Sequence, residues 1–254
     1  MIRIKTKKKF GQHFLKNEKI LHQISLTHLN QKNILEIGPG TGALTKYLII
    51  KRSNLVLIEI DSDCINYINK NFKNIKIIND DILQVNFLKI FKSKFSVISN
   101  LPYNISSQVF FKVLEYRDYI TEFTFLLQKE VAQRICSNSG KKTYGILSVL
   151  IQTFYKTDYI LEVGPKEFDP PPKVDSALIT GLRNKTINIG VSFNYFKKIV
   201  KQSFQNRRKT LRNSLKNLNL PKKFVSQSIF SKRAEQLDIK DFIWLTNQIK
   251  KIEK

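Results

Sequence analysis

Short, largely apolar runs alternate with helical patterns through the first hundred residues, and this order restricts the fold more than any other feature. The runs are Asn33–Ile37, Leu55–Ile58, Ile75–Ile78 and Phe95–Ile98. A glycine-rich turn follows the first run, and helical patterns begin at Ala43 and again at Asp61. This alternation is typical of a doubly wound parallel sheet, and runs without polar alternation indicate strands covered on both faces. We therefore predict an α/β, Rossmann-like fold.

Further elements are expected beyond residue 100. They are helices at Ser106–Tyr116, Lys129–Cys136 and Tyr144–Phe154, strands at Thr121–Leu127 and Val174–Leu182, and a polyproline-like stretch at Phe168–Pro172. The polar, turn-rich residues 184–190 predict a boundary between a domain at 1–185 and a small all-α domain at 186–254. The helices expected in the second domain are Phe193–Phe204, Arg207–Leu218, Pro221–Phe230 and Lys240–Ile249.

The charge of the chain predicts a polyanionic partner, because the formal net charge is +24. Only nine of the 44 basic residues are Arg, and many residues are Lys, Asn or Ile. This bias is typical of an AT-rich coding background, so the positions of the Arg are more informative than the total. Arg207, Arg208 and Arg212 fall within six positions, beside Lys209. We predict that this cluster contacts RNA phosphates; the alternative is a solvated helix face, which is usual for runs of Lys.

Several classes of protein are disfavoured. Cys64 and Cys136 lie far apart, and no histidine forms a ligand pattern with an acidic cluster. We therefore predict no metal site, no disulfide framework and a reduced, cytoplasmic setting. No apolar stretch is long enough to span a bilayer, and no apolar segment follows the basic arm at residues 1–9, which is therefore not a signal peptide. A monomer is expected because no long apolar stripe is left exposed.

Three successive strand ends carry groups that suit an adenosine. Gly38-Pro39-Gly40-Thr41-Gly42 lets a ligand approach the backbone closely, while Pro39 removes an amide donor that a phosphate cradle would use. Glu59, at the end of the next strand, is placed to bind both ribose hydroxyls, and Asp81 to accept from an adenine amino group. For each acid the alternative is a helix N-cap or a solvated loop carboxylate. The pattern fits S-adenosylmethionine best.

The fourth strand ends in Asn100-Leu101-Pro102-Tyr103. Pro102 fixes the direction of the Leu101 carbonyl, Asn100 adds a neutral acceptor, and Tyr103 offers a flat face. A strand-ending turn is the alternative. If both oxygens accept from an adenine N6 amine, they orient its lone pair towards a methyl donor without a general base. Tyr103 would then hold a base that has left its helix. We predict that these four residues form the catalytic motif.

Several motifs resemble the KsgA (RsmA) family of small-subunit ribosomal RNA adenine dimethyltransferases. They are Gly11–Leu15, Glu36–Gly42, Asn100–Ser106, Leu127–Val131, Phe168–Ser176 and Asn206–Arg212. The resemblance runs from about Lys9 to the C-terminal helices. It implies transfer of two methyl groups from S-adenosylmethionine to N6 of each of two adjacent adenosines. These lie in a hairpin loop near the 3′ end of 16S rRNA in the 30S subunit, and the family implies a role in ribosome maturation.

The resemblance also implies roles for single residues. The cofactor positions of the family fall on His13, Leu15, Gly38, Glu59, Asp81 and Asn100. His13 stands where many bacterial members have Asn, and both side chains can donate a hydrogen bond. The stretch around Phe168 resembles the part that closes over the target base, so Phe168 is expected to stack on the base opposite Tyr103.

Two other functions are possible readings of the same chain. The related 23S rRNA adenine methyltransferases that confer macrolide resistance share the chemistry, but the segment from Asn206 to Leu215 is similar to the KsgA type. A non-catalytic RNA-binding assembly factor could keep the fold alone. The presence of Asn100, Glu59 and the glycine-rich turn favours an enzyme over that reading.

Overall fold

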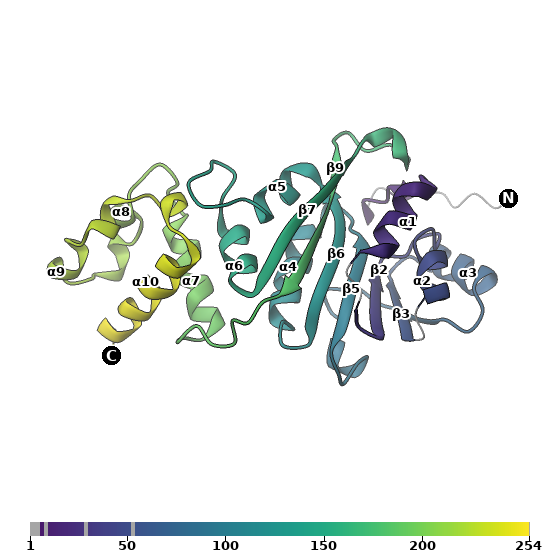
Figure 1. Ribbon diagram of the computed structural model, residues 1–254, viewed down its shortest axis with the longest axis horizontal. Coiled ribbons are helices and arrows are strands. Elements are labelled where there is room, and N and C mark those ends of the chain that lie inside the picture. Colours follow the sequence, from purple (N-terminus) through teal and green to yellow (C-terminus); the bar gives the residue numbers. More distant parts are fainter. Residues whose placement is uncertain (1–5, 8–9, 28–29, 52–53, 254) are drawn as a thin grey trace. The chain divides into compact units, whose positions relative to one another are not determined.

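A computed structural model describes residues 6–7, 10–27, 30–51 and 54–253 (Figure 1). The chain forms two compact units. The first contains residues 1–132 and 155–183, and the second contains residues 133–154 and 184–254. The predicted boundary near residue 185 lies where the chain enters the second unit for the last time, while residues 133–154 also belong to that unit. The assignment of methyl transfer to residues 1–185 and of RNA binding to residues 186–254 stays a prediction.

Seven strands of the described chain form one sheet in the first unit, in the order β4-β3-β2-β5-β6-β9-β7. Their bounds are β2 Asn33–Ile37, β3 Asn54–Glu59, β4 Lys76–Asn79, β5 Phe95–Asn100, β6 Ile120–Gln128, β7 Tyr155–Val163 and β9 Ser176–Arg183. The strands from β4 to β6 are parallel, whereas β9 is antiparallel to both of its neighbours. This mostly parallel sheet confirms the predicted α/β fold. The chain reverses its winding between β2 and β5, where such sheets bind ligands.

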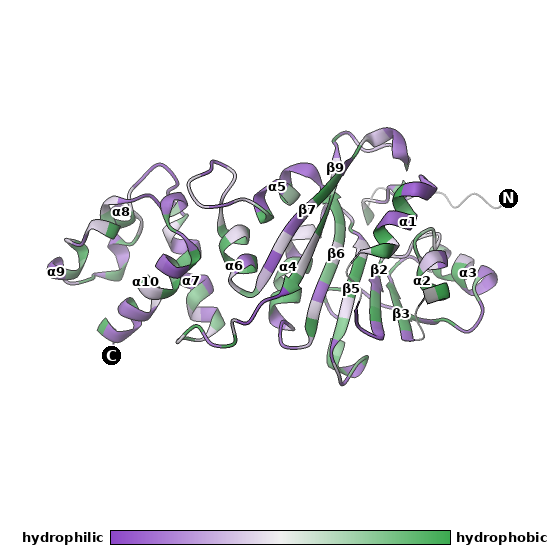
Figure 2. Cartoon of the chain, in the orientation of Figure 1, coloured by the Kyte–Doolittle hydropathy of each residue, from purple (hydrophilic) through white to green (hydrophobic). Residues whose placement is uncertain are grey.

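Helices lie on both sides of the sheet (Figure 1). They are α1 Glu18–Leu26, α2 Thr45–Lys51, α3 Ser62–Asn71 and α4 Ser106–Glu115, and α5 Lys129–Ile135 follows β6 directly. The strands are predominantly apolar, as Figure 2 shows, and Ile34, Leu57 and Ile98 are fully buried. Helix α1 begins where the Asn17 side chain accepts from the backbone N–H of Lys19 and Ile20.

Two features of the first unit were not predicted. Strand β7 lies at an edge of the sheet, and only its end residues Tyr155 and Val163 are buried, while those between them are half-buried or exposed instead of forming an apolar run. The short strands β1 Phe14–Leu15 and β8 Phe168–Asp169 pair with each other, antiparallel. Within the polyproline-like stretch, Phe168 therefore has a strand partner near the N-terminus.

The second unit contains α6 Ile146–Phe154, α7 Phe193–Ser203, α8 Leu211–Ser214, α9 Lys222–Val225 and α10 Ile239–Ile252. The two predicted long helices at Arg207–Leu218 and Pro221–Phe230 are wrong, since α8 and α9 are single turns followed by 3-10 turns. The backbone of Leu211 instead donates to the carbonyl of Lys232, two residues beyond the second segment, at 2.8 Å. In the part of the chain that the structure describes, no helix is long and apolar enough to cross a membrane.

Candidate active site

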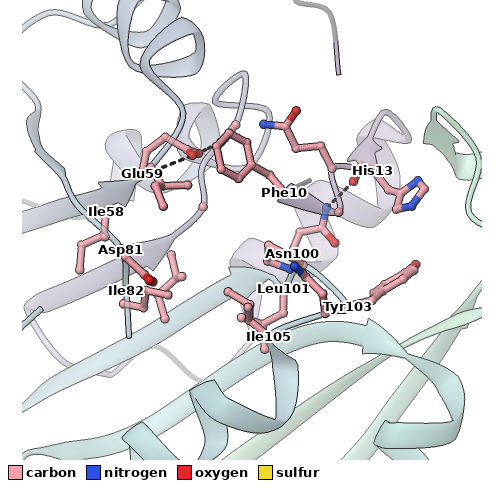
Figure 3. A pocket seen from close by; sticks show the side chains of 18 of the residues that line it. Phe10, His13, Ile58, Glu59, Asp81, Ile82, Asn100, Leu101, Tyr103 and Ile105 are labelled. Atoms are coloured by element: carbon pink, nitrogen blue, oxygen red, sulfur yellow. Dashed lines mark hydrogen bonds between the residues drawn. The ribbon is translucent and has the colours of Figure 1, made fainter. Parts of the chain in front are cut away.

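A cavity of about 250 Å³ opens at the carboxyl ends of β2, β3 and β5 and beside the turn after β4 (Figure 3). Residues 10–14 of the N-terminal segment complete its wall. Most of the side chains and backbone positions that the sequence singled out meet there. They are His13, Gly38, Glu59, Asp81, Asn100, Leu101, Pro102 and Tyr103. They meet because parallel strands bring their carboxyl ends to one edge of the sheet.

Gly38 and Gly40 give the cavity a wall of bare backbone. Both have positive φ, +62° and +57°, which favours glycine. A Cβ at Gly38 would meet only Pro102 Cδ, at 4.0 Å, and Gly38 itself faces the cavity. A Cβ at Gly40 would lie 2.6 Å from the ring of Phe14. Larger residues would therefore take ligand space at the first position and displace the N-terminal segment at the second.

Glu59 is the buried carboxylate of the cavity, with 6% of its surface exposed. Its Oε1 accepts the backbone N–H of Ile60 and Asp61, both at 2.9 Å, and its Oε2 accepts the N–H of Gly40 at 3.1 Å. Burial raises the pKa of Glu59, and these three donors partly offset the increase. A carboxylate has about four acceptor positions, and the three amides occupy three of them, so one position, on Oε2, is left for a ligand hydroxyl.

A second carboxyl group, Glu36, lies beneath the glycine turn and is 2% exposed. Its Oε2 accepts the hydroxyl of Thr45 at 2.8 Å. Burial raises the pKa of Glu36 to about 8. At neutral pH the group is therefore mostly protonated, and it does not place a second full negative charge beside Glu59.

Asp81 lies in the turn after β4 and faces the cavity (Figure 3). Its Oδ1 accepts the N–H of Leu83 at 2.9 Å, which leaves Oδ2 for a ligand. The ammonium group of the buried Lys112 donates to the Leu83 carbonyl at 2.8 Å and so anchors the turn. One oxygen of Asp81 therefore caps the turn, as in the alternative interpretation, and binding of an adenine amino group by the other oxygen stays a prediction.

The Asn100 side chain is held by one end only. Its Nδ2 donates to the carbonyl of His13 at 2.9 Å, and Figure 3 shows Oδ1 turned away from that carbonyl. The Leu101 N–H donates to the Leu126 carbonyl at 2.8 Å, so the backbone beside Pro102 is fixed to the sheet. Among the described residues, neither Asn100 Oδ1 nor the Leu101 carbonyl accepts a hydrogen bond. Both residues line the cavity, so neither oxygen is committed to another described group there.

Tyr103 stands at the mouth of the cavity and is partly exposed. Its hydroxyl is hydrogen-bonded to Ser176 Oγ at 2.6 Å, which fixes the plane of the ring. Burial raises the pKa of Tyr103, so the hydroxyl stays protonated. The ring of His13 is stacked on Tyr103, with centroids 5.4 Å apart and planes inclined by 25°. An aromatic surface therefore lies beside the two acceptors.

Comparison with known proteins identifies the family. A family model described as "Ribosomal RNA adenine dimethylase" matches residues 3–251. Ribosomal RNA small subunit methyltransferase A of Flavobacterium johnsoniae is 48% identical over 254 residues, covering 98% of this chain and 97% of the relative. The protein of the same name from Cytophaga hutchinsonii is 44% identical over 258 residues, covering 98% and 99%. The chain belongs to the ribosomal RNA adenine dimethylase family.

Solved structures agree with this membership. A dimethyladenosine transferase from Plasmodium falciparum has a TM-score of 0.82 and 28% identity, covering 95% of this chain and 98% of the other. The 23S rRNA methyltransferase ErmE, at 21% identity and a TM-score of 0.68, covers 95% and 100% and shows a shared fold. Membership confirms the predicted family, the predicted rRNA adenine dimethyltransferase activity and S-adenosylmethionine as the methyl donor. The predictions of a monomer, a metal-independent reaction and a cytoplasmic setting stay predictions.

The residues of the cavity fit this cofactor. Gly38 leaves open space where any other residue would place a Cβ. Glu59 supplies a carboxylate suited to ribose hydroxyls, and the free oxygen of Asp81 suits an adenine amino group. Ile82 is buried and Ile60 is 45% exposed, and both line the cavity, so apolar groups are available on either side of a heterocycle.

Two residues expected at the site lie elsewhere. Phe168 is only 1% exposed and belongs to the hydrophobic core with Leu15, which is 3% exposed and is its partner in the β1–β8 pair. In this arrangement Phe168 has no free face for a base, so the expected stacking opposite Tyr103 does not fit. Leu15 does not line the cavity, and its burial indicates that it anchors the N-terminal segment.

Ion pairs and a hydrogen bond that hold the N-terminal segment in place were not predicted from the sequence. The Lys7 ammonium group forms ion pairs with Asp61 and, at 2.7 Å, with Asp63, while Gln12 Nε2 donates to Asp61 Oδ2 at 2.8 Å. These hydrogen bonds raise the pKa of Lys7. Burial opposes ionisation of Asp61, but Lys7 and Gln12 still hold its pKa below the usual value. Because Asp61 follows Glu59 closely, the segment is tied beside the proposed ribose site.

The predicted RNA-binding cluster lies in the second unit, and all four of its basic side chains are exposed. Arg207 donates to the carbonyls of Lys142 at 2.5 Å and Tyr144 at 3.1 Å. Arg212 donates to the Val225 carbonyl at 3.3 Å. Within the described chain, Arg208 and Lys209 have no ion pair. Of the basic arm at residues 1–9, Arg3, Lys5, Lys8 and Lys9 lie outside the described residues.

Proposed function

We propose that this protein transfers two methyl groups to N6 of each of two adjacent adenosines in a hairpin loop near the 3′ end of 16S rRNA, within the 30S subunit, and thereby takes part in subunit maturation. The observation that carries the proposal is the pair of neighbouring acceptors, Asn100 Oδ1 and the Leu101 carbonyl, beside the ring of Tyr103. Relatives named for the small ribosomal subunit at up to 48% identity support the choice of rRNA.

The geometry of the cavity supports an assignment of the cofactor residues. We assign ribose binding to Glu59 and adenine binding to Asp81, with Gly38 allowing close approach of the methionine part. When bound, S-adenosylmethionine supplies an electrophilic methyl group on a positively charged sulfur. His13 contributes its backbone, because its carbonyl accepts from Asn100 and so directs Oδ1 of the amide.

The target amine is a weak nucleophile, since its lone pair is delocalised into the adenine ring. Asn100 Oδ1 and the Leu101 carbonyl accept its two N–H groups and direct the lone pair to the methyl carbon. The two oxygens would stabilise the positive charge that N6 gains when it accepts the methyl group, before a proton leaves to solvent. After the first transfer one N–H remains, so the second transfer can use only one acceptor.

The proposed function is tested with 30S subunits that lack the modification and with S-adenosylmethionine labelled in its methyl group. The wild-type protein is expected to incorporate four methyl groups per subunit at two neighbouring adenosines of the 3′ hairpin. Mapping the label in digested rRNA gives the positions. Absence of incorporation, or label confined to another rRNA, would refute the proposal.

The basic cluster of the second unit gives a separate prediction. Replacing Arg208 and Lys209 by Gln is expected to weaken binding of the 30S subunit and to reduce the slope of log K against log salt by about 2, one for each lost phosphate contact. Filter binding over a salt series measures both. Replacing Lys222 and Lys223, an exposed pair on α9, by Gln is the matched control.

Arg207 is a poor choice for that test because it is bonded to the carbonyls of Lys142 and Tyr144. Its replacement would disturb the second unit as well as any phosphate contact. If the Arg208 and Lys209 variant kept the wild-type salt slope while the control changed it, RNA binding would have to be assigned to α9 instead.

A further inference from the structure

The face of Tyr103 that looks towards the two acceptors is covered by another ring. His13 and Asn100 lie on the same side of the Tyr103 ring (Figure 3), and the imidazole stacks there with centroids 5.4 Å apart. An adenine whose N6 reaches Asn100 Oδ1 and the Leu101 carbonyl must occupy this same side. The target base and the imidazole therefore compete for one face, or the base lies between the two rings.

The hydrogen bond that holds the imidazole covers neither face of the ring. Its Nδ1 lies 2.7 Å from the carbonyl of Pro170, which can only accept, so Nδ1 carries the proton. This hydrogen bond lies in the plane of the ring and fixes its orientation without covering either face. The adjacent residue, Phe14, pairs with Asp169 in the β1–β8 pair, which holds the backbone of the segment.

We propose, on the basis of the proposed function, that the His13 imidazole is the second wall of the slot for the target adenine, opposite Tyr103. Phe168, the residue expected there from the family, is buried in the core and has no free face. A base between two rings needs two stacking gaps of about 3.4 Å. The distance between the centroids of the two rings, 5.4 Å, must therefore increase to about 7 Å when the base enters. In the free protein His13 keeps the slot closed.

Two substitutions separate stacking from hydrogen bonding. His13→Phe keeps a flat ring and loses the bond to Pro170, whereas His13→Asn keeps a donor and loses the ring. If the imidazole stacks on the base, kcat/KM for 30S subunits is expected to fall about three-fold in His13→Phe and about thirty-fold in His13→Asn. The dissociation constant for S-adenosylhomocysteine, measured by calorimetry, is expected to change by less than about two-fold in both variants. His22→Asn, on the exposed face of α1, is the matched control.

The opposite order, with His13→Asn more active than His13→Phe, would overturn the proposal and leave His13 with a hydrogen-bonding role. Equal losses in the two variants, or a parallel loss of cofactor affinity, would also overturn it. A structure of the wild-type protein with the rRNA hairpin is independent of any folding defect in the variants. The base between both rings is expected, and a base on the far face of Tyr103 with the 5.4 Å stack intact would refute the proposal. Failure of the proposed function can be distinguished from failure of this proposal, because in the first case the wild-type protein would not methylate the subunits.

Discussion

Replacing Asn100 by Ala is expected to lower kcat for methyl transfer to unmodified 30S subunits by at least about 100-fold. This is the scale of losing one preorganised hydrogen-bonding group that acts on the reacting centre. Asn100 lines the cavity, and its Oδ1 accepts no hydrogen bond from any described residue. Removing Oδ1 therefore removes a contact that only the substrate makes. Single-turnover transfer of labelled methyl groups measures the effect.

The substitution also removes the donor to the His13 carbonyl, so an indirect effect has to be separated. Cofactor affinity and Tm are therefore measured on the same variant, and both are expected to change little compared with kcat. Asn71→Ala, at the exposed end of α3, is the matched control for the chemical change. A rate within about three-fold of wild type in Asn100→Ala would remove the catalytic role assigned to this residue.

Replacing Glu59 by Gln is expected to weaken binding of S-adenosylmethionine by about 100-fold. Hydrogen bonds to a charged group are worth about 1.5–3 kcal/mol, and the neutral amide has one acceptor oxygen in place of two. The amide NH2 would also face a backbone donor, either Gly40 or the pair Ile60 and Asp61. Because at least one buried donor is left without an acceptor, Tm is expected to fall as well.

The same residue predicts a pH dependence of cofactor binding. Burial raises the pKa of Glu59 above that of an exposed glutamate, although three backbone N–H groups oppose the increase. As pH falls through this raised pKa, the carboxylate gains a proton and loses an acceptor, so affinity is expected to decrease on acidification before exposed glutamates titrate. Calorimetry between neutral and mildly acid pH measures it for wild type, Glu59→Gln and the exposed control Glu115→Gln. The same pH dependence in Glu59→Gln as in wild type would assign the effect to another group.

The sequence by itself determined the parallel part of the sheet and the residues at the ends of its strands. Strands that are apolar throughout and helices of regular period follow from local residue patterns, and chain order in a parallel sheet then places Gly38, Glu59, Asp81 and Asn100 at neighbouring strand ends. The motifs also determined the family, because several of them occur in order along one chain. Neither conclusion depended on contacts between distant side chains.

Helix prediction failed where tertiary contacts replace local ones. The segments from Arg207 and from Pro221 have a helical pattern, yet each folds into a single α-helical turn, and Leu211 at the start of the first turn donates to the distant carbonyl of Lys232. Only the tertiary structure showed that Arg207 is committed to carbonyl groups of its own unit, whereas Arg208 projects without an ion pair among the described residues. A residue pattern cannot distinguish two adjacent exposed arginines.

Which aromatic side chains lie at the proposed base site was likewise decided by the tertiary structure alone. Phe14 and Leu15 pair with residues more than 150 positions later, and that pairing buries Phe168 while bringing the His13 ring onto Tyr103. Local periodicity carries no information about which distant segment fills a given space, since packing depends on the shape left by the rest of the fold. The sequence therefore placed the candidate site at the open edge of the sheet and indicated the cofactor of the family, and only the tertiary structure decided which aromatic rings lie at the proposed base site.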